Sequence, residues 1–270
     1  NHDPIILANT PQKFTINNFL LYNNDSELKV DGFILDDFTQ DIRIQVRNLR
    51  GGLLGKYLLG FKDNDDEFTV NIYTKIAGTR MQPIINFDLA GEDIIINDKN
   101  LGSMYVDLDY QNKNLETLVH FTDSTKNTLK PLLTLEGSIP IYIGVDSENN
   151  KVDSLENLKL HLITNNFNIA SLGRVIPTIV NQKGTLNSEI DISGTLSDLD
   201  YDGYLSLKNS TFLVDVTNLS YGLDMELSFE KEKVIVQNIT LRNVGKNKFL
   251  GKIIADGEIN TNGFEVESIL

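Results

Sequence analysis

The residue types most often found in catalytic and metal sites are scattered along this chain. Its three histidines are His2, His120 and His161, and none has a second ligand at the spacing that metal sites use. His120 and His161 each stand inside an alternating run, so we interpret both as outward-facing strand residues. His2 beside Asp3 could bind a surface metal, but no further ligands accompany it. The histidines therefore predict no metal centre.

Carboxylates are the second group of candidates. Three pairs stand two residues apart in strand-like runs: Asp107 and Asp109, Glu189 and Asp191, and Asp224 and Glu226. Residues i and i+2 of a strand share a face, so such a pair could act in acid–base hydrolysis of a sugar chain. The same pairs are expected wherever the wet face of a sheet needs charge, and the three do not converge on one place. An enzyme acting on polysaccharide therefore ranks third among our hypotheses.

Two further segments hint at ligand loops, and both lack required residues. The acidic run 63–67 would need Gly and Glu at the sixth and twelfth positions of a calcium loop, where Phe68 and Thr74 stand. The glycine-rich run 51–55 lacks the lysine of a phosphate loop, and neither a nucleophile elbow nor a dinucleotide fingerprint is found. We therefore expect a protein that is not an enzyme, with no catalytic residues, no metal and no cofactor.

Composition excludes several classes of protein. The chain has 270 residues, a formal net charge of −14 and no cysteine. Without cysteine there are no disulfides, no thiolate catalysis and no cysteine-based metal site. The negative charge repels phosphates, so nucleic acid is excluded as a partner. Acidity does not exclude lipid, because burial of acyl chains is independent of charge sign.

Alternation of apolar and polar residues dominates the chain and predicts strands. The cleanest run has Leu223, Met225, Leu227 and Phe229 alternating with polar residues. Similar runs occupy 42–47, 68–73, 104–110, 158–163 and 190–193. Turn-forming segments separate them, at 23–26, 63–66, 112–114, 147–150, 230–233 and 260–263. The spacing predicts antiparallel hairpins joined in sequence.

A short phrase, polar–Gly–x–apolar, recurs six times at the edges of alternating runs. It reads Asp31–Ile34, Glu136–Ile139, Lys183–Leu186, Ser193–Leu196, Asp202–Leu205 and Asp256–Ile259. Recurrence along the whole chain predicts one long repetitive β-structure. It argues against an enzyme with one localised active site.

Two segments do not fit the strand pattern. Residues 49–61 have near-helical apolar spacing that is weakened by four glycines, so we expect a short helix or an apolar loop. Residues 168–180 carry one apolar stripe and predict a short helix, which Pro177 would bend or end. The only credible helix thus lies between two β-stretches.

These patterns predict an all-β fold with one or two short helices. We expect residues 1–270 to form a single elongated, antiparallel, curled sheet, a half-pipe with an apolar groove. The alternative is two packed β-sandwiches, whose inward residues alternate in the same way.

Residues 168–259 resemble the TamB/AsmA-like family of bacterial envelope proteins. The resemblance rests on the order of a short apolar helix (169–177), Gly184-Thr185-Leu186, the Ser-Gly-Thr-Leu phrase at 193–196, and later Gly-x-apolar phrases at 202–205 and 256–259. The family often has a proline shortly after Ser-Gly-Thr-Leu, and Leu199, Asp200 and Tyr201 stand there in this chain. The first 160 residues share only the general texture of the family.

The resemblance implies a long β-groove with an apolar floor, similar to bridge-like lipid-transfer proteins. Family members are anchored in the inner membrane, cross the periplasm, and are implicated in phospholipid transport or in outer-membrane protein assembly with a barrel partner. This chain has no starting Met, no leader and no aromatic-rich end, so we expect an internal or truncated segment whose anchor lies elsewhere. The expected location is the periplasm or cell envelope.

We therefore expect an envelope module that holds phospholipid acyl chains in aid of outer-membrane biogenesis. The expected lipid-contacting residues are Ile190, Ile192, Leu205, Leu207, Leu223, Met225, Leu227 and Phe229. A large uncovered apolar patch would mark a binding site. The alternative is a structural or adhesive cell-surface β-repeat protein with a filled core.

Overall fold

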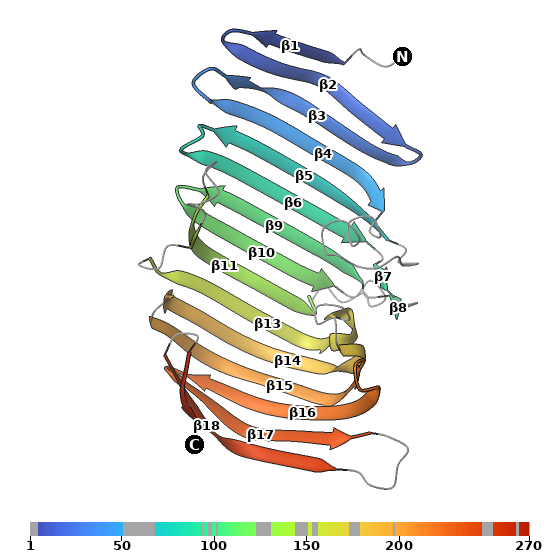
Figure 1. Cartoon of the computed structure of the whole chain (residues 1–270), viewed down its shortest axis with the longest axis vertical. Coiled ribbons are helices and arrows are strands. Elements are labelled where there is room, and N and C mark those ends of the chain that lie inside the picture. The colour runs from blue at the N-terminus through green and yellow to red at the C-terminus, as the bar shows by residue number, and fades with distance from the viewer. Residues whose placement is uncertain are drawn as a thin grey trace. The chain divides into compact units, whose positions relative to one another are not determined.

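The computed structural model of the chain is all-β and antiparallel (Figure 1). It describes residues 5–50, 68–92, 94–96, 99–100, 102–122, 131–143, 151–152, 156–172, 179–196, 198–244, 251–262 and 265–269. The chain divides into two compact units. Unit 1 is Asn1–Leu129 with Glu136–Asp153, and unit 2 is Lys130–Leu135 with Ser154–Leu270. Within the described ranges, no helix has the length and apolarity needed to cross a membrane.

Unit 1 is an antiparallel meander in which each long strand pairs with the next along the chain. Its strands in pairing order are β1 (Ile6–Thr10), β2 (Lys13–Asn23), β3 (Ser26–Leu35), β4 (Gln40–Arg50), β5 (Thr69–Gly78), β6 (Pro83–Glu92), β9 (Ser103–Gln111) and β10 (Asn114–Thr122). The short strands β7 (Ile95–Ile96) and β8 (Lys99–Asn100) form a separate pair. The long strand β11 (Leu133–Tyr142) pairs with β12 (Lys151–Val152) and spans the boundary between the two units.

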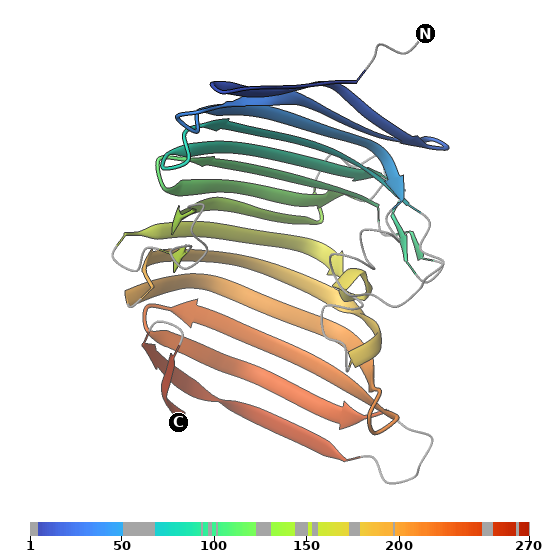
Figure 2. The ribbon, with the colours of Figure 1, turned by 45° about the horizontal axis from the view of Figure 1, so that its top comes forward.

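Unit 2 repeats this arrangement. Its strands in pairing order are β13 (Leu158–Asn168), β14 (Ile179–Thr195), β15 (Asp198–Val214), β16 (Leu219–Glu230), β17 (Lys233–Asn243), β18 (Lys252–Asn262) and β19 (Glu265–Ile269). A four-residue 3-10 helix, η2 (Ile169–Leu172), follows β13. In each unit the sheet is curled and unclosed (Figure 2).

Five of the six glycines of the repeated phrase lie well inside strands, which corrects the expectation that they stand at the edges of alternating runs, and Gly194 is the last residue but one of β14. All six have positive φ, from 108° at Gly194 to 152° at Gly257. A Cβ on Gly203 would lie 2.0 Å from the carbonyl oxygen of Glu189, and one on Gly32 would lie 2.2 Å from that of Asp41. Only glycine can hold this backbone. The phrase therefore encodes glycine kinks within strands, a device that curves a sheet.

Asparagine provides a second recurrent device, at bulges where one extra residue enters a strand. Asn18, Asn48, Asn166 and Asn209 have φ between 50° and 54° and lie at register shifts. In each case a side-chain oxygen on the paired strand accepts the asparagine's backbone N–H. The acceptors, in the same order, are Asp31, Asn71, Asn187 and Asp224, at 2.8, 3.0, 2.8 and 2.7 Å. Asparagine tolerates the left-handed conformation, and the acceptor satisfies an N–H that the bulge leaves unpaired.

The fold prediction is confirmed at the level of class. The protein is all-β, antiparallel, curled and unclosed, and the long described strands β1–β6, β9 and β10 of unit 1 and β13–β18 of unit 2 pair in series. The clean run 223–229 lies inside β16, and the turn segments 23–26, 112–114 and 230–233 each join two paired strands.

The helix predicted for 168–180 is wrong where it can be compared. Ile169–Leu172 is a single 3-10 turn, and Ile179 and Val180 already pair with Val214 and Leu213 in β14–β15. β-Branched side chains fit a paired strand better than a short helix. Residues 173–178 lie outside the described part, as do 51–61 of the second helix or loop prediction, the acidic run 63–67 and His2.

Candidate functional site

Strand register gathers the predicted lipid-contacting residues of unit 2 on one face of the sheet. Directly opposed residues of antiparallel strands point to the same side. Ile190 opposes Gly203, Leu205 opposes Leu227, and Leu207 opposes Met225. The bulge at Asn209 adds one residue, after which Ser210 opposes Leu223 and the phase is kept. All eight predicted residues share this side, which we call the apolar face of unit 2.

The apolar face continues on both sides of the predicted residues. On β17, Val234, Val236, Ile239 and Leu241 oppose Phe229, Leu227, Met225 and Leu223. On β13, Leu160 and Leu162 oppose Ile192 and Ile190. A strip of apolar side chains therefore crosses at least five strands, where alternation alone had marked three.

Burial on this face is uneven. Ile190 and Leu207 are 7% and 9% exposed, whereas the other six predicted residues remain half-buried. In the described part of the chain only nine apolar residues are fully buried, which is few for a filled core. Half-burial is what one sheet layer gives to side chains that touch their neighbours along and across strands.

The opposite side of unit 2, which we call its polar face, carries several ion pairs. Lys208 Nζ lies 2.9 Å from Glu226 Oε1, and Lys233 Nζ lies 2.9 Å from Glu258 Oε2. Lys231 Nζ lies 3.3 Å from Asp200 Oδ1. Such exposed pairs contribute little to stability, so their effect is chiefly to keep this face wet and its charge balanced.

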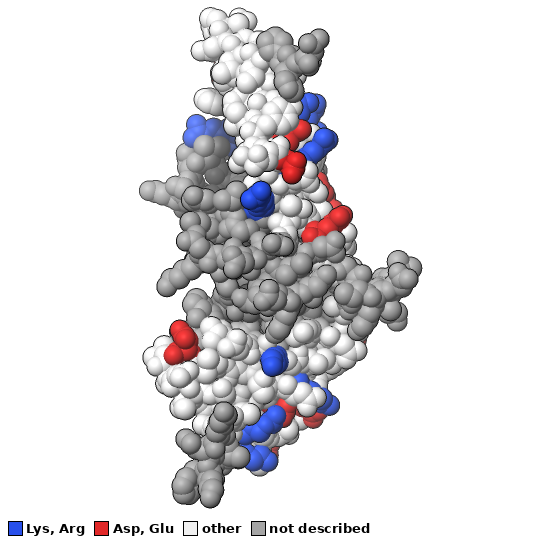
Figure 3. All heavy atoms as spheres, turned by 90° about the vertical axis from the view of Figure 1, so that its right-hand side faces the viewer, with Lys and Arg blue, Asp and Glu red and all other residues white. Residues whose placement is uncertain are grey.

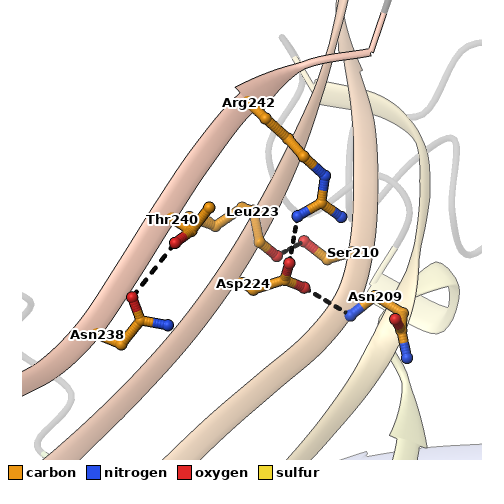
Figure 4. Close-up of polar contacts among 7 residues, drawn as sticks. All are labelled: Asn209, Ser210, Leu223, Asp224, Asn238, Thr240 and Arg242. Atoms are coloured by element: carbon orange, nitrogen blue, oxygen red, sulfur yellow. Dashed lines mark hydrogen bonds and ion pairs between the residues drawn. The ribbon is translucent and has the colours of Figure 1, made fainter. Parts of the chain in front are cut away.

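Asp224 is the best connected carboxylate of that face (Figure 4). Its Oδ1 accepts the Asn209 backbone N–H at the bulge, and its Oδ2 accepts a hydrogen bond from Arg242. Burial alone would raise the pKa of Asp224, but the bonds from Arg242 and Asn209 outweigh it and hold this pKa below its ordinary value of 3.8. Next to it, the Ser210 hydroxyl donates to the Leu223 carbonyl oxygen. Asp224 thus fastens three strands together.

Unit 1 has the same two-sided pattern. Its apolar face brings Leu28 opposite Val46, Ile72 opposite Leu89, and Leu89 opposite Val106. Further members of this face include Val30, Ile42, Ile44, Ile76, Ile85, Phe87, Met104, Leu108 and Val119. No site residues were predicted here from the sequence, although the same alternation in 42–47 and 104–110 was the signal that could have found them.

The polar face of unit 1 holds an open hollow of about 680 Å³ over β4, β5, β6, β9 and β10. Tyr73, Ala90, Tyr105 and His120 are among its lining residues. This hollow was not predicted from the sequence. Its position depends on a small residue that lies, through strand pairing, beside larger residues of neighbouring strands, and the sequence does not give that pairing.

Charged side chains of both signs are visible on the side of the molecule drawn in Figure 3. Basic and acidic side chains lie close to one another along the right-hand margin of that view.

The other chemistry-bearing residues take structural positions. His161 and His120 lie on the polar faces, as predicted, with His161 Nδ1 2.7 Å from Asp191 Oδ1. All three carboxylate pairs also lie on polar faces, spread over β9, β14 and β16. No group of three or more metal-ligating side chains occurs among the described residues.

Comparisons with known proteins add nothing to this geometry. No protein-family model, curated protein or solved structure matches the chain.

Proposed function

We propose that the apolar faces of this protein form an open groove that holds phospholipid acyl chains. The observation that supports the proposal is the register, which keeps the eight predicted residues of unit 2 on one side across three strands and two chain reversals. Beyond the bulge at Asn209, Ser210 stands opposite Leu223, so β15 and β16 stay in phase on this face. An apolar strip this wide on one side of a sheet is a candidate binding surface.

The energetics suit a hydrocarbon ligand. Each lipid methylene removed from water contributes about 0.8 kcal/mol, so a modest length of acyl chain offsets the loss of its freedom. A hydrocarbon needs no polar partner, and the apolar face offers few. A surface without specific hydrogen bonds lets a lipid slide along it, which is the property a transfer path requires.

The wider role follows from the resemblance of residues 168–259 to TamB/AsmA-like proteins. We propose a non-enzymatic module of a bacterial cell envelope that shelters phospholipid between inner and outer membrane. Anchoring in the inner membrane, and a barrel partner in the outer membrane, belong to the same proposal.

Lipid recovery from the purified chain tests the proposal. The protein is expressed in bacteria, purified without detergent, and analysed by native mass spectrometry and by organic extraction for phospholipid. Leu227→Lys and Ile192→Lys place a charge on the apolar face. Ser228→Lys and Ser193→Lys place the same charge one residue along, on the polar face. We expect bound phospholipid to fall about tenfold or more in the first pair only, because a lysine among acyl chains is expensive.

Two outcomes would overturn the proposal. One is absence of phospholipid from the unsubstituted chain. The other is an equal loss of lipid in the matched polar-face variants, which would show that charge anywhere on the protein has the same effect. Thermal unfolding of all four variants separates lost binding from lost folding.

A further inference from the structure

The hollow on the polar face of unit 1 is built from two rows of residues that run across the strands. In one row, Tyr73, Asp88, Asp107 and Leu118 oppose one another in turn on β5, β6, β9 and β10. In the neighbouring row, Asn71, Ala90, Tyr105 and His120 do the same. Gln45 and Arg47 of β4 also line the hollow, as do the residues between these positions, Val46, Ile72, Leu89 and Val106. Every element that contributes belongs to unit 1.

Depth in this hollow comes from Ala90. It stands between Asn71 and Tyr105, and its single methyl group leaves space that larger side chains surround. The Tyr105 and His120 rings lie 5.3 Å apart at 53° and form an aromatic wall on one side. Tyr73 lines the hollow from another strand, β5. The volume of about 680 Å³ falls within the range of small-molecule sites.

Two carboxylates of the hollow, Asp88 and Asp107, are exposed to solvent and available to a ligand. Neither Asp88 nor Asp107 makes a hydrogen bond or ion pair within the described chain, although they stand directly opposite each other. Burial, and then the carboxylates of Asp109 and Asp88, raise the pKa of Asp107 above its ordinary value of 3.8. The Arg47 guanidinium and the Gln45 amide line the same hollow and supply donors to complement these acceptors.

We propose that this hollow binds a neutral sugar unit of a carbohydrate chain. A sugar ring presents an apolar C–H face that packs on an aromatic ring, and Tyr105 and Tyr73 offer such rings. Its rim of hydroxyls donates and accepts at once, which suits carboxylate acceptors beside amide and guanidinium donors. The site lies on the side opposite the apolar face, so the inference does not depend on the proposed lipid function.

Charge narrows the class of ligand. The lining has one cation, Arg47, and two anions, Asp88 and Asp107, so the formal sum is −1 with His120 neutral. An anionic ligand would meet two unpaired carboxylates at close range and is disfavoured. An organic cation would satisfy the carboxylates but would leave the amides and the arginine without a role. A neutral polyhydroxyl ligand uses all of them.

The binding test uses the full chain labelled with ¹⁵N and titrated with defined probes. The sugar probes are maltose, cellobiose and N,N′-diacetylchitobiose, and tetramethylammonium chloride is the cation probe. We expect at least one disaccharide to give saturable amide shifts confined to β4, β5, β6, β9 and β10. No saturable shift with any of the three sugars, or saturation by tetramethylammonium alone, overturns the proposal.

Variants assign the binding to the hollow. Tyr105→Ala removes the aromatic wall, and Ala90→Leu fills the space beneath it. Each should weaken sugar binding by about tenfold or more, as truncating a central aromatic contact does elsewhere. Tyr204→Ala is the matched control, since Tyr204 is a 47% exposed tyrosine on the polar face of unit 2. Equal loss in Tyr204→Ala, or unchanged binding in Tyr105→Ala, contradicts the assignment, and phospholipid content should stay unchanged in all three variants.

Discussion

Two regions of the polar faces, one over β14–β17 of unit 2 and one over β6 and β9 of unit 1, differ in how their carboxylates are satisfied. In unit 2, Asp224 is bonded to Arg242, Glu226 lies beside Lys208, and Asp191 lies beside His161. In unit 1, Asp88 and Asp107 oppose each other across β6 and β9 with no such partner in the described chain. Elsewhere in unit 1 carboxylates are paired, as Asp31 is with Lys29 and Asp41 with Arg43. The apolar faces, in contrast, have the same alternating composition in both units.

This difference separates carboxylates that hold the fold together, which we call structural charge, from carboxylates that a ligand could still contact, which we call available charge. A carboxylate that already accepts a bulge N–H and an arginine, as Asp224 does, has little left to offer a ligand. A carboxylate such as Asp107, whose pKa is raised by partial burial and by the neighbouring Asp109 and Asp88, is hydrated and can still accept hydrogen bonds from a ligand. The shared apolar faces are therefore candidates for one common ligand, and the region over β6 and β9 is a candidate for a separate role.

The largest effect is expected where the two units are alike, at the glycine kinks. Gly203→Ala in unit 2 and Gly32→Ala in unit 1 would each force a Cβ into a backbone carbonyl oxygen at 2.0 and 2.2 Å. The strained φ adds to this clash, so we expect a loss of about 3 kcal/mol or more in the free energy of unfolding. Urea unfolding measured by circular dichroism gives this value.

Gly251→Ala is the control for both glycine variants, because nothing lies within 4 Å of the Cβ that it would add. It should change the free energy of unfolding by less than about 0.5 kcal/mol. If Gly203→Ala is tolerated as well as Gly251→Ala, the glycine phrase does not encode kinks. If only one unit is sensitive, the two sheets do not share this device.

A medium effect should separate the paired from the unpaired carboxylates. Asp224→Ala leaves the Asn209 N–H and the Arg242 guanidinium without their acceptor, and we expect a loss of about 1 kcal/mol in the free energy of unfolding. Asp88→Ala removes no described contact and should leave the free energy unchanged within about 0.5 kcal/mol. Equal losses in the two variants, measured by urea unfolding, would remove the distinction between structural and available charge.

Strand period made most of this fold predictable. Alternation in 223–229 indicated both the strand and its apolar side, because side-chain direction in a strand has a period of two. Pairing order followed from short turns such as 231–232, which leave a chain little choice but to pair with its neighbour. The shared face of the eight predicted residues was implied by the same rule once the register was known.

The bulges and the hollow were not predictable in the same way. The bulge at Asn209 shifts the alternation of side chains along β15 by one residue. The sequence alone does not show that Asp224 on the next strand will accept the Asn209 N–H. The hollow depends on Ala90 lying beside Tyr105, a neighbour fixed by register between strands β6 and β9. Side-chain neighbours on adjacent strands depend on such registers, and a single bulge changes all those beyond it.

Acid should weaken both units through their bulge carboxylates. The N–H of Asn18 lowers the pKa of Asp31, and hydrogen bonds overcome burial to lower that of Asp224, in each case from 3.8. A lowered folded-state pKa means stabilisation that is present above 3.8 and is lost as pH falls through the lower folded value. Asp224→Asn should therefore be less stable than the unsubstituted chain at about pH 7, with a gap that narrows below about pH 4 in urea titrations. A gap independent of pH would show that the carboxylate charge contributes nothing.

The smallest effect has the opposite sign and belongs to unit 1. Burial and the neighbouring Asp109 and Asp88 raise the pKa of Asp107 above 3.8, so the folded state resists its ionisation. Folding stability at this residue is then present below 3.8 and is lost as pH rises through the raised folded value. Asp107→Asn removes the repulsion and should increase the free energy of unfolding at neutral pH by up to about 0.5 kcal/mol, with no gain in acid. A loss at neutral pH in urea unfolding would mean that Asp107 has a stabilising partner, and it would then resemble Asp224 in being held by the fold and inaccessible to a ligand.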